Sequence, residues 1–148
     1  MLTEILSQLF TRDLNKLKAE ILAYRNENKI WIIDKEIKNS AGNLCLHLIG
    51  NLNTYIGAQM GNSGYQRDRE SEFSLKDIPV QQLVKMIEET IVTIQSSLER
   101  LPASALAAQH PFAVFEHKTS TEFLLVHLAT HLSYHLGQVN YHRRLLDL

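Results

Sequence analysis

The stretch STEFLLVHLATHLSYHLGQVNYHRRLL, residues 120–146, decides the fold class. It contains no proline and a single glycine, and its apolar residues recur with the period of an α-helix. The preceding segment Thr119-Ser120-Thr121-Glu122 is typical of a capping box, with Thr119 as the N-cap and Glu122 three positions on. We therefore predict a long helix from Ser120 to Leu146.

Three further segments share this periodicity, and the whole chain has only six Gly and three Pro to interrupt them. They predict helices over residues 3–24, 41–59 and 78–101. Two connections, 60–76 and 102–118, are longer than most loops and of a length that is often functional. Four helices with two long connections favour an all-α protein, and the natural architecture is a four-helix bundle.

Local signals mark the ends of these helices. Asn39-Ser40 is a capping signal for the second helix, and Asp77 is the candidate N-cap of the third. Pro79 then falls in the first turn of the third helix, where proline is tolerated. The short segment 29–34 has a β-like composition, but we interpret it as an apolar connection that packs Trp31 against the bundle.

Length, charge and hydropathy exclude several classes of protein. A chain of 148 residues has the length of one domain, so we expect a single domain over 1–148. Fifteen Lys and Arg against sixteen Asp and Glu give a formal charge of −1, without the basic excess of nucleic-acid binders. No apolar run approaches the ~20 residues of a membrane span, and the N-terminus lacks a signal-peptide pattern. We expect a soluble, cytoplasmic protein with neither nucleic acid nor a membrane as partner.

Histidine is the residue type that stands out, with seven in the chain and four between 127 and 142. On an ideal helix His127, His131 and His135 lie at roughly 0°, 40° and 80°, with Gln138 near 20° and His142 near 60°. These side chains therefore share one face with core-facing leucines. An unpaired polar group buried there costs about 1–3 kcal/mol, so several on one stripe need a shared explanation.

Metal binding is one such explanation. A His-x-x-x-His pair presents two nitrogens on one side of a helix, as in helical zinc sites. His47 lies on the inward stripe of helix 41–59, and Asn51 follows one turn later as a possible partner for a ligand. Three imidazoles from two helices leave coordination positions open, the pattern of catalytic sites. Histidines satisfied separately in the core or on the surface are the alternative.

The segment from His127 to Val139 resembles the C-terminal helix of the DinB-like (YfiT-like) superfamily, in which His-x-x-x-His-x-Gly-Gln marks two metal ligands. The segment 43–51 similarly resembles the part of that family's second helix that carries the first ligand. The resemblance implies a four-helix bundle, often a homodimer, with one divalent ion bound by His47, His131 and His135. His127 is then an accessory residue. Leu136 departs from the pattern, which often has a basic residue there.

Relatives in that superfamily include thiol-dependent S-transferases and isomerases. The resemblance therefore implies a metal that activates a low-molecular-weight thiol, with an electrophile beside it and no catalytic residue beyond the metal site. Imidazole ligands suit zinc or nickel, and also iron. Hydrolysis by a metal-bound water stays open as an alternative. So does a non-catalytic bundle, in which the metal only stabilises a binding or structural module.

Other residues receive lesser roles. We expect Tyr55 and Tyr134 to line a cavity near the site, and Gln138 to support a ligand. The segment from Arg67 to Glu70 mixes charges and is expected to be a solvated surface run, from which Arg67 or Arg69 could contact an anionic cosubstrate. His142 lies too far along the helix to join the same ion, so a supporting or surface role is expected. The remaining candidate, Cys45, is the single cysteine, which excludes an intrachain disulfide, and we interpret it as a buried apolar residue.

Overall fold

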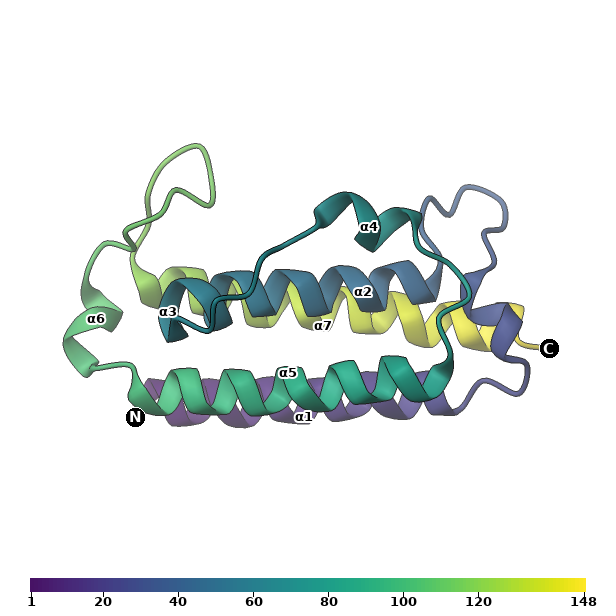
Figure 1. The fold of residues 1–148 in the computed structure, drawn as a ribbon, viewed down its shortest axis with the longest axis horizontal. Helices are drawn as coiled ribbons and strands as arrows, with labels where there is room; N and C mark the ends of the chain where they lie inside the picture. Colours follow the sequence, from purple (N-terminus) through teal and green to yellow (C-terminus); the bar gives the residue numbers. More distant parts are fainter.

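The structure is a computed structural model that describes residues 1–148, and it is all-helical, as predicted. Its only β-type pairing is an isolated bridge between Gln109 and Ser120. Four helices are much longer than the rest and run side by side (Figure 1): α1 (Leu2–Leu22), α2 (Ala41–Leu52), α5 (Val80–Arg100) and α7 (Thr121–Leu146). Helices α1 and α2 each pack against both α5 and α7.

The long connections are not structureless. The first contains α4 (Arg69–Ser74), and the second contains α6 (Ala103–Ala107). A 3-10 helix, η1 (Glu27–Trp31), occupies the segment before α2, and Trp31 is buried there as predicted. No helix is both long enough and apolar enough to span a bilayer.

The apolar stripes of the long helices meet in one core. Phe10 and Leu14 from α1, Leu48 from α2, Ile87 from α5 and Leu124 from α7 are all fully buried in it. Burial of each such side chain contributes about 1.5–3 kcal/mol, so this core supplies most of the driving force for packing the helices.

Helix α2 is buried on every side because α4 covers the face that the long helices leave free. The Asn43 side chain donates hydrogen bonds to the backbone carbonyls of Glu72 (2.9 Å) and Leu75 (2.8 Å), which fixes α4 on α2. Two glycines of α2 permit close approach there. A Cβ at Gly42 would overlap the Trp31 ring, and one at Gly50 would overlap the Glu72 carboxylate.

The prediction of one regular helix over 41–59 is wrong at its C-terminal end. The α-helix ends at Leu52 and widens into the π-helix η2 (Asn53–Ala58) before α3 (Gln59–Gly61) closes the segment. Asn53 donates to the carbonyl of Ile49 at 2.9 Å and Thr54 to that of Gly50 at 2.7 Å. Such side-chain bonds to carbonyls four residues back compete with the regular ladder, which explains the local widening.

Two predicted N-caps are also wrong. Ser120, not Thr119, caps α7, because its hydroxyl accepts the Phe123 amide at 3.2 Å. Asp77 adopts a left-handed conformation with φ 59°, and Pro79 is the N-cap of α5. The first amide of α5 instead donates to the Glu27 carboxylate, which comes from a distant part of the chain.

His142 is buried in the interior, so the expected surface role is wrong. Its Nε2 donates to the Ile32 carbonyl (2.8 Å), which leaves Nδ1 to accept from the Tyr24 hydroxyl (2.7 Å). These bonds join the C-terminal part of α7 to the residues after α1 and η1. Burial lowers the pKa of His142, because the charged imidazolium would lose its hydration.

We expect His142→Ala to lower the free energy of unfolding by about 1–3 kcal/mol, because the Tyr24 hydroxyl and the Ile32 carbonyl lose their partner. His142→Gln is the matched variant, since an amide can both donate and accept, and it should retain most of the stability. Urea denaturation at neutral pH measures both. Equal losses in the two variants would contradict the hydrogen-bond explanation.

Stability should also depend on pH through this residue. In the unfolded chain the pKa of His142 has its ordinary value near 6.5, whereas in the folded protein it is lower. Between these two values the unfolded chain binds a proton that the folded protein does not. Neutral His142 therefore makes its full contribution to the free energy of unfolding above about pH 6.5, and this contribution is lost as the pH falls through the lowered pKa. We expect the free energy of unfolding to fall less between about pH 7 and pH 5 in His142→Gln than in the native protein. Parallel slopes would show that His142 does not contribute.

Candidate metal centre

Three histidines converge between α2 and α7. One nitrogen each of His47, His131 and His135 lies within 4.8 Å of the other two. The Nε2 atoms of His47 and His131 are 3.3 Å apart. Two nitrogens bound to one tetrahedral zinc ion would be separated by about 3.3 Å, given the usual Zn–N distance. The residues predicted as ligands are thus brought together at distances that suit a shared ion.

Glu72 orients the first of these rings. Its Oε1 lies 3.1 Å from His47 Nδ1, so this nitrogen carries the proton and Nε2 presents its lone pair to the cluster. The Phe73 ring packs against His47 with 5.0 Å between the ring centroids. Glu72 comes from α4 and is buried against α2 where Gly50 leaves room.

Arg67 holds the Glu72 carboxylate in place. Its Nε and Nη2 donate to the two carboxylate oxygens at 2.8 and 2.9 Å. This bidentate pair raises the pKa of Arg67 further above its usual value. The Arg67 side chain is only 14% exposed, so its assignment to a solvated surface run is wrong. A buried carboxylate requires such a partner, because an unpaired charge is costly in the interior.

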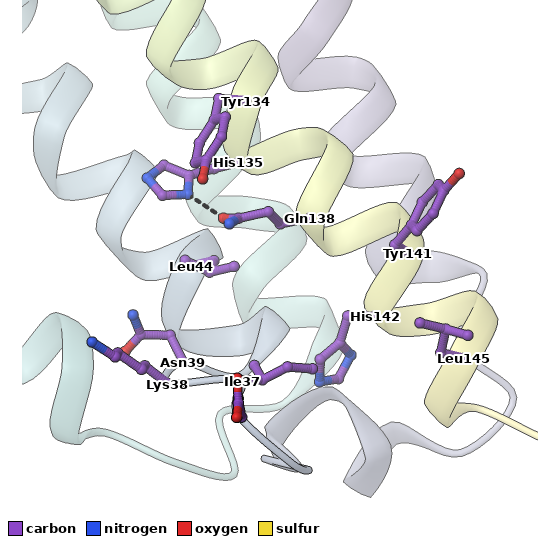
Figure 2. Close-up of a pocket in the computed structure, with 11 residues that line it drawn as sticks. Ile37, Lys38, Asn39, Leu44, Tyr134, His135, Gln138, Tyr141, His142 and Leu145 are labelled. Carbon is purple, nitrogen blue, oxygen red and sulfur yellow. Dashed lines mark hydrogen bonds between the residues drawn. The ribbon is translucent and has the colours of Figure 1, made fainter.

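Gln138 orients the ring of His135 in a comparable way. Its Oε1 lies 2.7 Å from His135 Nδ1, which therefore donates and leaves Nε2 for the cluster. Figure 2 shows this bond as a dashed line along one side of a cavity. Gln138 was predicted to support a metal ligand, and this hydrogen bond orients the ring of His135.

His131 lacks a comparable partner. Its Nδ1 is buried without a hydrogen bond, and so is the Oδ1 of Asn51, one turn after His47. Burial, together with the positive charges that neighbouring histidines can carry, lowers the pKa of His131 to about 4. Burial also lowers the pKa of His47. Both rings are therefore neutral at physiological pH, the form that binds a metal.

A cavity of about 390 Å³, here called the polar cavity, adjoins two of the three rings. His47 and His131 line it, together with Asn51, Tyr55 and His127. The His127 ring stacks on His131 at 6.2 Å between centroids and lies outside the group of three converging nitrogens. An ion at the cluster could therefore meet a small molecule from this side.

A second cavity, of about 500 Å³ and lined largely by apolar surface, lies on the other side of His135. Figure 2 shows Tyr134, Gln138 and Tyr141 of α7 along one wall, with Leu44 of α2 opposite. Tyr55 and Tyr134 were predicted to line one cavity, but they line different ones. Tyr134 is 66% exposed and belongs to the outer edge.

Two further residues stay outside the site. Cys45 is fully buried, and burial raises the pKa of its thiol to about 12, so it is not a nucleophile at neutral pH. His110 is buried away from the cluster, with its Nε2 2.8 Å from the Gln59 side-chain oxygen.

A family model described as "Protein of unknown function (DUF1572)" matches residues 3–147. No curated protein matches the chain. No solved structure matches it either.

We expect Glu72→Gln to weaken zinc affinity about 10- to 100-fold, because the amide orients His47 without the carboxylate's charge. The control is Glu70→Gln, which removes an exposed carboxylate from the same short helix. Competition with a chromophoric chelator measures affinity, and circular dichroism checks that both variants fold. Indistinguishable affinities in the two variants would rule out this role for Glu72.

Proposed function

Because the chain belongs to the DUF1572 family, whose function is unknown, we propose a function from the site and from the resemblance to the DinB-like superfamily. The protein binds one divalent metal ion through His47, His131 and His135. It uses the ion as a Lewis acid on a small molecule in the polar cavity. The observation that carries this proposal is the convergence of three imidazole nitrogens, two of them on rings oriented by Glu72 and Gln138.

Three neutral ligands leave the ion its full double charge and at least one open coordination position. Zinc or nickel suits such a set of ligands, and iron also fits. When bound, the ion supplies Lewis-acid chemistry, which lowers the pKa of a coordinated thiol or water. The cavity beside His47 and His131 offers the route by which such a molecule would arrive.

We also assign the chain to the DinB-like (YfiT-like) superfamily, as one four-helix-bundle domain over residues 1–148. The side-by-side packing of the long helices α1, α2, α5 and α7 supports the bundle. The hydrogen bond that His135 donates to Gln138 supports the assignment, because it explains physically why a glutamine follows the last ligand of the motif. The homodimer is carried over from this resemblance.

For the reaction we propose thiol-dependent transfer. A low-molecular-weight thiol would lose its proton as it binds, and its sulfur would form a bond to an electrophilic carbon. The bond from that carbon to its leaving group, such as chloride, would break, and the leaving group would depart with the electron pair. His127 lines the same cavity and offers a nitrogen that can accept the released proton. No other residue of the chain is required to form a bond to the substrate.

Elemental analysis of tag-free protein tests the metal site directly. After incubation with zinc or nickel and dialysis, we expect one ion per chain in the native protein and none in His131→Ala. His127→Ala is the control and should keep the ion, because His127 lies outside the converging group. Loss of metal in both variants would indicate a closed four-ligand structural site, and no metal in any sample would overturn the proposal.

Product analysis tests the reaction. Metal-loaded protein with a small thiol and 1-chloro-2,4-dinitrobenzene should form the thioether faster than the uncatalysed mixture. In His131→Ala the rate should fall to that background. Thiol-independent hydrolysis of an activated ester by the same protein would favour a metal-bound water instead. Neither activity across a panel of electrophiles and esters would favour a non-catalytic metal site.

A further inference from the structure

We propose that the polar cavity selects a ligand with a carboxylate group, which pairs with Arg67 and Arg69 while another atom of the ligand reaches the metal. This inference rests on the proposed function for the position of the ion. It adds the chemical class of the molecule that binds there.

The charges around the polar cavity carry the inference. Its lining contains two arginines and three histidines but no aspartate or glutamate. The residues that line it are His47, Asn51, Tyr55, Arg67, Arg69, Val114, Phe115, His127, Leu128 and His131. Glu72 lies behind His47, and both of its oxygens are already engaged by Arg67 and His47. With a divalent ion at the histidines, the cavity has a strong positive potential that favours an anion.

Arg67 retains donors for such a ligand. A guanidinium has five N–H groups, and Arg67 uses one on Nε and one on Nη2 for Glu72. Three N–H groups remain. The nearby His47 Nδ1, at 3.4 Å from Nη2, is itself a donor and cannot accept from them, and the Tyr55 side chain engages at most part of this set. The guanidinium is also held over the Tyr55 ring, 5.8 Å from its centroid. It is thus a fixed donor close to a ligand of the metal.

Arg69 supplies an unpaired charge at the same cavity. Its guanidinium lies 5.7 Å from the centroid of the Phe73 ring, and no carboxylate forms an ion pair with it. Arg67 is partly neutralised by Glu72, so Arg69 contributes most of the uncompensated charge of the protein at this site.

Two residues that line the cavity each carry a buried polar atom without a hydrogen-bond partner. Asn51 is only 8% exposed, and its Oδ1 accepts no hydrogen bond, while His131 Nδ1 is likewise unpaired. Both atoms are themselves enclosed, and Asn51 Oδ1 can only accept a hydrogen bond, so the preference for a carboxylate rests on the two arginines. The larger cavity beyond His135 offers no such signal, because its lining is largely apolar and contains Glu36 beside Lys38.

Three small thiols that differ only at their far end test the inference: 3-mercaptopropionate, 3-mercaptopropanamide and cysteamine. Calorimetric titration of the zinc-loaded protein should show the carboxylate binding at least about tenfold more tightly than the amide, with the amine weakest. Arg69→Gln should reduce the preference for the carboxylate over the amide several-fold. Arg69→Glu should abolish it.

Arg144→Gln is the matched control, because Arg144 also lies over an aromatic ring, that of Tyr141 at 5.3 Å, but away from the cavity. It should leave the preference unchanged. Equal or absent binding of the three thiols to metal-loaded protein overturns this inference and leaves the metal site intact. The same holds if Arg144→Gln and Arg69→Gln act alike. Protein that takes up no metal overturns the proposed function, and this inference with it.

Discussion

The contact on which the site depends is the one between the Glu72 carboxylate and its two partners, Arg67 and His47. It gives His47 the tautomer that can bind a metal, and it holds the connection that contains α4 against α2. It also fixes the arginine that faces the polar cavity. The buried Glu72 carboxylate thereby orients the His47 ring, holds α4 on α2 and positions the Arg67 guanidinium at the polar cavity.

Helix α7 serves the core and the candidate site with one sequence. Leu124, Leu128 and Leu132 are buried among the other helices, while His131 and His135 project from the adjoining part of the surface. His142 uses the same face two turns later for structure alone, bonded to Tyr24 and Ile32. Histidines on one face of α7 therefore have different roles, and the groups that neighbouring elements place beside each ring determine which role it has.

The all-helical class and the approximate helix positions could be predicted because periodicity is a local property of the sequence. Bringing His47 near His131 and His135 could also be anticipated, since all three lie on inward faces. The capping signal at Ser40 was confirmed, whereas the N-cap of α7 was misplaced because Thr119 and Ser120 are both competent and only the backbone decides between them. The role of Glu72 could not be predicted from the sequence. Its contact with His47 spans 25 positions and depends on how the connection that contains α4 folds back on α2, and residue spacing gives no information about that path.

Gly50 has a consequence for how this sequence can change over time. A side chain at this position would occupy the space of the Glu72 carboxylate, so the two positions are not free to vary separately. A larger residue at 50 would become acceptable only with a shorter acid, such as aspartate, at 72, or with a different route for the chain after Gly61. Substitutions at the two positions should therefore occur together, so a glycine without a side chain constrains how the candidate site can change.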